Sequence, residues 1–159
     1  GTKYVAFRDE EGQLAILDAY CPHLGADISV GGKVEDGCVR CPFHAWRFDK
    51  SGECNDVPYA KKIPRGAKVG SHPVSEVNGI IFMWHDPAGE APHYEIPAVE
   101  EYASDQWLDW AINSVTIKTH PREVVENVAD AAHFPTVHNT HVEKFDNVYA
   151  MSPEKQTLV

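Results

Sequence analysis

The sequence predicts an all-β domain of antiparallel, hairpin-built sheets, followed by the beginning of an α+β domain. Short β-rich runs separated by Gly, Pro and Asp predict the first domain, and they continue from residue 3 to about residue 86. A different pattern, strand-like and then helical, predicts the second domain further along the chain. The β-rich runs of the first domain are KYVAFR, LAILDAY, CVRC, WRFD, HPVSEV and GIIFMWH.

A connector is expected between the two domains. Residues 87–92, with the sequence PAGEAP, end the strand pattern, and an acidic, Pro-containing stretch follows them. Because both the composition and the periodicity change here, the boundary falls in this stretch. We therefore predict a first domain over residues 1–90, a connector over residues 91–104 and a second domain over residues 105–159.

The second domain is expected to begin with a strand and a helix. Residues 113–119 alternate in polarity as a strand does, and the segment REVVENVADAAHF after Pro121 has helical composition and spacing. The tail from Val142 is mixed in character and ends without a stop signal, and the chain begins with Gly just before a strand-like run. We therefore expect a fragment whose second domain is incomplete.

Charge and composition exclude some classes of partner. The net charge of −10 and the pI near 5.3 argue against a general affinity for nucleic acid or anionic lipid, which need clustered Lys and Arg. No apolar run approaches the roughly 20 residues of a membrane helix, and the N-terminal segment lacks the pattern of a secretory signal. We expect a cytoplasmic protein whose four cysteines serve as ligands or buried thiols.

Two short clusters each join a cysteine to a histidine. Cys21-Pro-His23 is followed after 17 residues by Cys41-Pro-Phe-His44, and each cluster lies where a β-rich run gives way to a turn. Two sulfide-bridged iron ions need two protein ligands each, which two thiolates and two imidazoles supply. A Cys2His2 structural zinc site uses the same ligand types, but such sites usually pair Cys with Cys and His with His. The mixed spacing therefore favours a [2Fe-2S] cluster.

The segments CPHLGA and CPFHAW resemble the two cluster loops of Rieske proteins, and the similarity extends through most of residues 4–86. Ala45 departs from the family, in which Gly commonly follows the second histidine. Rieske proteins of respiratory complexes carry a further Cys in each loop, which is lacking here, so the resemblance is to the lower-potential ferredoxin and oxygenase type. We interpret Cys38 and Cys54 as structural thiols and expect Trp46 to pack under the cluster.

A second group of metal-binding residue types lies in the predicted helix. Asp130 and His133 are three residues apart, so on a helix the carboxylate can hydrogen-bond the imidazole. His133 and His138 are five apart and would diverge on a straight helix, but Pro135 predicts a bend near Phe134 that brings them together. Two imidazoles and one carboxylate form the facial triad of non-haem iron oxygenases. The alternatives are ordinary helix-end histidines and a zinc pair.

The pattern Glu-x3-Asp-x2-His-x4-His resembles the mononuclear iron motif of Rieske oxygenase α subunits. The resemblance implies that His133 and His138 bind a mononuclear Fe(II), that Asp130 receives an electron from a Rieske histidine, and that Glu126 and Asn127 support this bridge. In that family the bridge joins adjacent subunits, so a homotrimer is implied, and the second domain has a helix-grip fold. The third ligand is a carboxylate that we expect beyond the end of this chain.

These two sites predict an oxygenase component. An electron from a reductase or ferredoxin would enter the cluster, pass through Asp130 and support O2-dependent hydroxylation, dihydroxylation, demethylation or desaturation of an organic substrate, steroid or aromatic. VPYAKKIP and FMWHDPAGEAPHYEIP are similar to stretches of steroid-acting members, the ketosteroid hydroxylases and cholesterol desaturases. One alternative is a Rieske ferredoxin-like electron carrier, against which residues 123–138 count. Another is an incomplete polypeptide that holds the cluster without activity.

Overall fold

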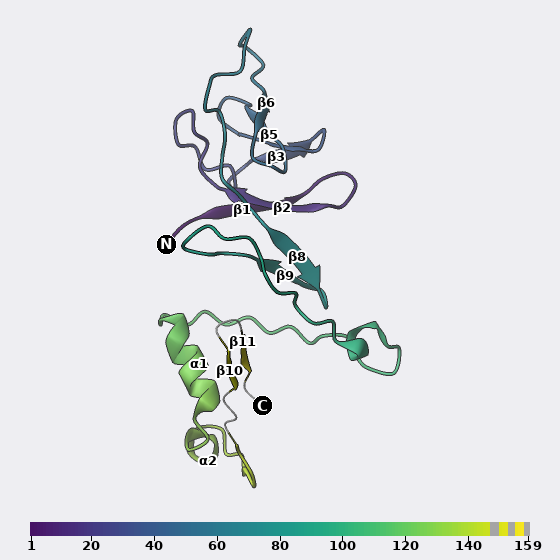
Figure 1. Ribbon diagram of the computed structural model, residues 1–159, viewed down its shortest axis with the longest axis vertical. Coiled ribbons are helices and arrows are strands. Elements are labelled where there is room, and N and C mark those ends of the chain that lie inside the picture. Colours follow the sequence, from purple (N-terminus) through teal and green to yellow (C-terminus); the bar gives the residue numbers. More distant parts are fainter. Residues whose placement is uncertain (147–149, 153–154, 158–159) are drawn as a thin grey trace. The chain divides into compact units, whose positions relative to one another are not determined.

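The computed structural model describes residues 1–146, 150–152 and 155–157, the last two ranges as backbone only. The chain divides into two compact units, Gly1–Trp107 and Leu108–Val159. Figure 1 shows that strands dominate the first unit, and the helices α1 and α2 lie in the second. Within these described ranges, no helix is long and apolar enough to cross a membrane.

Antiparallel sheets make up the first unit, which confirms the predicted all-β domain. One sheet has the order β1-β2-β7, a second runs β3-β4-β5-β6, and β8 pairs with β9. β2 is buried at three successive residues, because it is the central strand of its sheet. The strands are β1 (Tyr4–Arg8), β2 (Leu14–Asp18), β3 (Lys33–Glu35), β4 (Cys38–Arg40), β5 (Arg47–Phe48), β6 (Cys54–Asp56), β7 (Ser71–His72), β8 (Val74–Val77) and β9 (Ile80–Met83).

Three of these strands carry no apolar alternation in the sequence. β3, β6 and β7 read KVE, CND and SH, and each is two or three residues long. Periodicity cannot be recognised over so few residues. These strands exist because neighbouring strands satisfy their backbone N–H and C=O groups, for example where Glu35 lies opposite Cys38.

The hydrophobic core of the first unit includes the bases of both Cys/His loops. Leu17 of β2 and Phe48 of β5 are among its largest fully buried side chains. Cys21, Cys41 and Trp46 belong to the same buried cluster. Fully burying one large apolar side chain contributes about 1.5–3 kcal/mol. The loops that carry the cysteines are therefore anchored by the core rather than by their own exposed turns.

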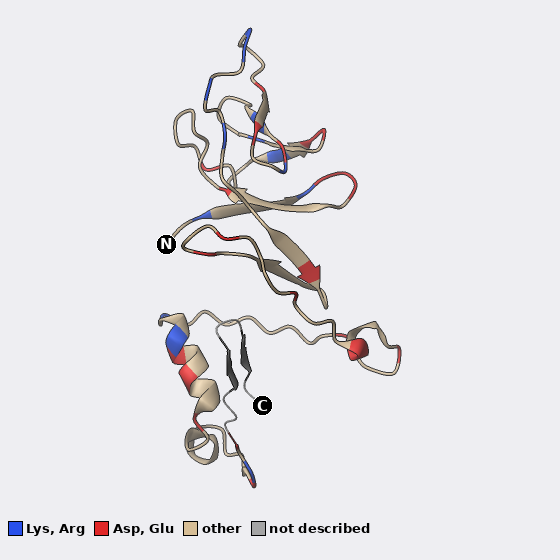
Figure 2. Cartoon of the chain, viewed as in Figure 1, with Lys and Arg blue, Asp and Glu red and all other residues tan. Residues whose placement is uncertain are grey.

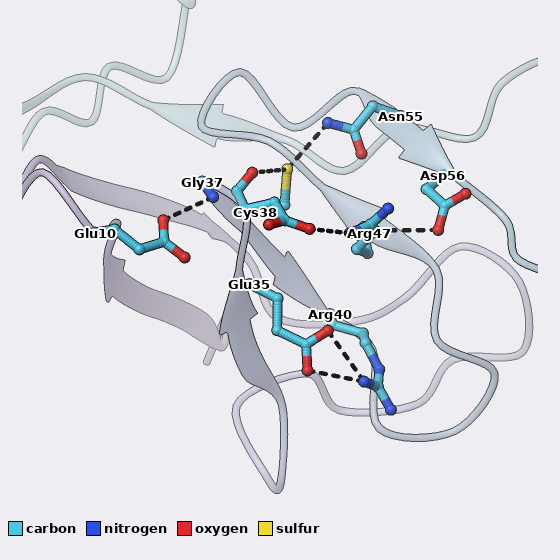
Figure 3. A network of polar contacts seen from close by, with 9 residues as sticks. Glu10, Glu35, Gly37, Cys38, Arg40, Arg47, Asn55 and Asp56 are labelled. Carbon is cyan, nitrogen blue, oxygen red and sulfur yellow. Dashed lines mark hydrogen bonds and ion pairs between the residues drawn. The ribbon is translucent and has the colours of Figure 1, made fainter.

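Ion pairs hold the strand that leaves the second Cys/His loop. Arg47 donates from Nη1 to Asp36 Oδ2 at 2.7 Å and from Nε to Asp56 Oδ2 at 3.1 Å (Figure 3). The strand register between β5 and β6 shifts at this point, which marks a β-bulge. Because Arg47 directly follows Trp46, these contacts fix the direction of the chain just after the loop.

The second unit begins without the strand that the sequence predicts. Residues 108–119 form no helix or strand, so the prediction over residues 113–119 is wrong. The apolar side chains of the alternating pattern are exposed instead, with Val115 at 78%. A strand requires a neighbouring edge for its backbone hydrogen bonds. None of the described strands pairs with this segment.

Two helices and a short hairpin complete the second unit. The first helix starts with Pro121 at its first position, where the missing N–H costs nothing. His120 caps it, because its Nδ1 accepts a hydrogen bond from the Arg122 N–H at 3.2 Å. The elements are α1 (Pro121–Ala129), α2 (His133–Val137), and the antiparallel strands β10 (Ala150–Ser152) and β11 (Lys155–Thr157).

Two glycines in β-turns provide a matched test of this fold. Gly52 has a φ of +81°, and a Cβ there would run into the backbone oxygen of Val69, whereas Gly12 has a φ of +80° and open space. We expect Gly12→Ala to lower the free energy of unfolding by about 1–2 kcal/mol, the cost of left-handed backbone for Ala. Gly52→Ala should cost about 2–5 kcal/mol, because overpacking is added. Urea denaturation measures both changes, and equal losses would contradict the clash at Gly52.

Candidate metal centres

The two Cys/His loops share one backbone geometry. In each loop the cysteine N–H donates to the carbonyl oxygen five residues later, at 2.9 Å for Cys21 and 2.8 Å for Cys41. The cysteine oxygen then accepts from the N–H four residues later, at 2.8 Å from Gly25 and 3.1 Å from Ala45. Both loops are thereby closed by main-chain hydrogen bonds, which hold the intervening histidine without help from its side chain.

The residue four positions after each cysteine has a left-handed backbone. Its φ is 72° at Gly25 and 60° at Ala45. Gly adopts this conformation freely, whereas an L-residue with a Cβ loses roughly 1–2 kcal/mol. Ala45, where Gly is common, therefore carries a conformational cost. The loop keeps its left-handed backbone there despite this cost.

The loops bring thiol to thiol and imidazole to imidazole. Cys21 and Cys41 are buried with their thiols beside each other. The half-buried rings of His23 and His44 form the second pair, with centroids 4.6 Å apart. His23 Nδ1 is buried without a hydrogen-bond partner, as a ring nitrogen that binds metal would be. Two separate ligand pairs fit a two-iron cluster, with one pair for each iron.

A single tetrahedral zinc fits this arrangement less well. Zinc in a Cys2His2 site draws all four ligands around one ion. The structure instead places thiol beside thiol and imidazole beside imidazole. This is the pairing that a two-iron cluster uses.

The buried Cys21 thiol needs a positive charge nearby in order to ionise. Burial raises the pKa of the Cys21 thiol to about 11, and the neighbouring Cys41 thiol adds to the increase. The thiolate that binds iron is therefore disfavoured until a metal cation compensates its charge. Loading of the site must then release protons, because both thiols bind as thiolates.

The other two cysteines have polar partners within the sheet. Cys38 Sγ accepts from Asn55 Nδ2 at 3.0 Å, and Cys54 Sγ donates to Asp56 O at 3.4 Å (Figure 3 shows the first contact). Burial raises the pKa of the Cys54 thiol. Both thiols sit on strands of one sheet, where they pack as small buried side chains.

Trp46 forms a wall against the imidazole pair. Its ring stacks on His23 with centroids 4.8 Å apart and planes within 9°, and its Nε1 donates to Tyr59 Oη at 2.6 Å. The Tyr59 ring also lies 6.4 Å from the His44 ring. The sequence motifs did not single out Tyr59, because this contact joins residues 13 positions apart and leaves no local signal.

The break between the two helices does not lie where Pro135 predicts it. α1 ends at Ala129, its C-cap Asp130 has an extended ψ of 104°, and α2 begins at His133. Pro135 sits in the first turn of α2, where its missing N–H has no helical partner to lose. The predicted bend near Phe134 is therefore wrong, and the chain turns at residues 130–132 instead.

This turn brings the second group of predicted residues together. Asp130 Oδ1 accepts from the Ala132 N–H at 2.8 Å, and its Oδ2 lies 3.3 Å from His133 Nδ1 without hydrogen-bond geometry. The His133 and His138 rings have centroids 5.2 Å apart. His133 Nδ1 is buried and lacks a hydrogen-bond partner, so this nitrogen is available to a metal. Glu126 lies exposed on α1.

Family matches cover almost the whole chain. Residues 1–73 match the Rieske [2Fe-2S] domain, so with its paired thiols and imidazoles the N-terminal part is a Rieske iron–sulfur domain. Residues 83–158 match the 3-ketosteroid 9alpha-hydroxylase C-terminal domain. With these two matches in this order, the chain belongs to the family of Rieske oxygenase components.

Curated relatives include steroid-modifying proteins. The chain is 44% identical over 152 residues to a 3-ketosteroid-9-alpha-monooxygenase oxygenase component of Rhodococcus rhodochrous, which covers 94% of this chain and 39% of the relative. It is 40% identical over 139 residues to a cholesterol 7-desaturase of Xenopus laevis, covering 87% of this chain and 31% of the relative. The chain therefore spans less than half the length of these relatives.

Solved structures of similar fold include a monooxygenase. Dicamba monooxygenase bound to dicamba superposes with a TM-score of 0.74 and 28% identity over 87% of this chain and 41% of that one. NdmB of Pseudomonas putida CBB5 gives a TM-score of 0.74 and 26% identity over 87% of this chain and 42% of that one. The matched part of this chain therefore shares the fold of these two proteins.

The equivalent backbone positions of the two loops allow a reciprocal test. Ala45→Gly should raise the free energy of unfolding by about 0.5–1 kcal/mol, because relief of the left-handed conformation outweighs the greater chain entropy of Gly. Gly25→Ala should lower it by a similar amount, since a Cβ there meets nothing within 4 Å. Urea denaturation of both variants without metal gives the two values. Changes of the same sign would contradict the shared geometry.

Proposed function

We propose that this chain carries the electron-transfer domain and part of the catalytic iron site of a steroid-modifying oxygenase. The pairing of thiol with thiol and of imidazole with imidazole supports the first part of this proposal. The match of residues 83–158 to a catalytic domain argues against a simple electron carrier. Its curated relatives act, by their names, on 3-ketosteroids and cholesterol, which supports a sterol or steroid substrate.

The residues of the first site have distinct roles in this function. When bound, a [2Fe-2S] cluster carries one electron, and a mononuclear iron uses such electrons to activate O2. Cys21 and Cys41 would hold the iron nearer the core, and His23 and His44 the outer one. The two imidazoles are only half-buried, so they form the edge through which an electron passes. Trp46 covers one face of His23 and keeps water from it.

The second site would hold iron through the first residue of α2 and the residue that follows its end. His133 and His138 would be two of the ligands, and a carboxylate further along the protein would be the third. Asp130 lies beside His133, with its Oδ2 3.3 Å from His133 Nδ1. The exposed side of Asp130 is free to receive a Rieske histidine of a neighbouring subunit, so we propose a homotrimer. Hydroxylation and desaturation are the reactions that the relatives' names suggest.

The same proposal includes the electron donor, the domain boundaries and the cellular location of the protein. A reductase or ferredoxin would supply electrons, because the relatives are oxygenase components of systems with several proteins. We retain the domain boundaries at 1–90, 91–104 and 105–159 as part of the proposal. The cysteines of the described chain are all unpaired thiols, which supports a cytoplasmic location.

The proposed cluster can be tested by substituting two buried cysteines, of which one is a proposed ligand and the other is not. Cys41→Ser should abolish the electron paramagnetic resonance signal of the reduced cluster and lower bound iron and sulfide, because a Ser hydroxyl is a much weaker iron ligand than a Cys thiolate. Cys54→Ser changes an equally buried thiol and should retain both. Iron and sulfide analysis accompanies the spectra. Zinc in place of iron in the unmodified protein, or the same loss in both variants, would refute the assignment.

Two histidines near α2 test the mononuclear site. In protein loaded with Fe(II), His133→Ala should remove the iron that is bound in excess of the cluster, since it deletes one of two protein ligands in the chain. His141→Ala changes an exposed histidine nearby and should leave that iron in place. Mass spectrometry of the metal content measures the difference. If both variants hold as much iron as the unmodified protein, His133 is not a ligand.

A further inference from the structure

One hydrogen bond holds Trp46 at a place where its packing leaves space. The indole is buried, and its Nε1 donates to Tyr59 Oη at 2.6 Å. On one side the ring lies near Phe48 of the core, with centroids 6.5 Å apart. On another side Trp46, Tyr59 and His23 line a cavity of about 380 Å³. The indole therefore has room to tilt, and the partner that its buried N–H requires fixes the plane of the ring.

A tight turn places the hydroxyl of Tyr59. The turn begins at Val57, which is buried in the core, and the Ala60 N–H donates to the Val57 oxygen at 2.9 Å. Pro58 occupies the second position of the turn, where its fixed φ is favourable. The Tyr59 side chain itself is 62% exposed, so the backbone of the turn, more than side-chain packing, sets where its hydroxyl lies.

The indole transmits this contact to a proposed cluster ligand. Its ring stacks on His23 with centroids 4.8 Å apart and planes within 9°. The face of an aromatic ring is partly negative and attracts positive charge close to it. When the indole N–H donates to Tyr59, the bond is polarised and electron density moves into the ring. Tyr59 therefore both orients the indole on His23 and makes its face more negative.

We propose that Tyr59 is a positioning residue that lowers the reduction potential of the cluster through Trp46. This inference rests on the proposed function, because it requires His23 to bind the outer iron. An imidazole on an oxidised iron is more positive than one on a reduced iron, so the stacked indole favours the oxidised cluster. A lower potential makes the cluster a stronger donor to the mononuclear iron. The contact lies within one chain and needs no free surface.

The test removes the hydroxyl of Tyr59 and compares a matched tyrosine. Tyr59→Phe keeps the ring and deletes the acceptor of the Trp46 hydrogen bond. Tyr94→Phe makes the same change at a tyrosine that is 56% exposed and whose ring also lies against a tryptophan, 5.3 Å from Trp84. Trp84 Nε1 donates to the Glu90 oxygen instead, so this control breaks no indole hydrogen bond.

A neutral substitution is needed because positive charges are close in the sequence. Residues 58–66, which include Tyr59, carry Lys61, Lys62 and Arg65 and no acidic residue, and Figure 2 shows positive residues on this segment. Cations near a cluster favour its reduced state. Tyr59→Phe changes no charge, so a shift in potential cannot come from a change in these charges.

The measurement is protein-film voltammetry of the cluster-loaded chain. At a fixed electrode potential, we expect the ratio of reduced to oxidised cluster to rise about threefold in Tyr59→Phe, which is a shift of about +30 mV for a one-electron couple. Tyr94→Phe should leave this ratio unchanged. The same potential in Tyr59→Phe as in the unmodified chain, a lower one, or an equal rise in Tyr94→Phe would overturn the role of Tyr59.

A double-mutant cycle shows whether Tyr59 acts through the indole. Trp46→Phe keeps an aromatic ring but has no N–H, so Tyr59→Phe should cause no further shift in this background. Additive shifts would overturn the proposal, because Tyr59 would then act on the cluster directly. The two single variants already decide the sign of the effect, so that result does not depend on whether Trp46→Phe holds a cluster.

Electron paramagnetic resonance with iron and sulfide analysis separates the two levels of the proposal. An unmodified chain without a Rieske cluster would refute the proposed function, and this inference with it. Where the unmodified chain holds the cluster, an unaltered potential in Tyr59→Phe refutes the positioning role alone. Loss of the cluster from Tyr59→Phe would refute it as well, because the hydroxyl would then maintain the loop rather than orient the indole.

Discussion

Two buried thiols set side by side on one hydrophobic core constrain the rest of the Rieske unit. Cys21 and Cys41 come from different loops, and each loop has to turn back on itself so that the two thiols lie side by side. Main-chain hydrogen bonds and a left-handed residue achieve this turn in both loops. The cost is electrostatic, since burial holds the pKa of Cys21 near 11 until a metal cation shares the site.

The imidazoles and their neighbours form the outer side of the same arrangement. Trp46 lies between the core and His23, so it belongs both to the packing of the fold and to the environment of the cluster. Tyr59 extends this contact to residues 58–66 through one hydrogen bond. The packing of the fold and the environment of the cluster are therefore continuous, and a change at Trp46 would affect both.

In the second unit, the rule that proline interrupts a helix holds, but the turn between the helices lies elsewhere than predicted. Pro135 does disfavour a helix that continues through it, but it is tolerated in the first turn of a new helix. Asp130 caps the C-terminal end of α1 and accepts a hydrogen bond from the Ala132 N–H, so the turn lies before His133 rather than after it. The grouping of Asp130, His133 and His138 could be predicted from spacing, whereas the position of the turn depends on how the helix ends.

The sequence by itself determined the hairpin-built β domain, the ligand types and their mixed spacing, because these features lie within short segments whose chemistry is local. Only the tertiary structure decided that thiol meets thiol and imidazole meets imidazole, and that Tyr59 supports Trp46. It also decided that residues 113–119 form no strand, although their alternation is that of one. Such outcomes depend on contacts between distant segments, which satisfy backbone groups and fill a core, and periodicity along the chain carries no record of them.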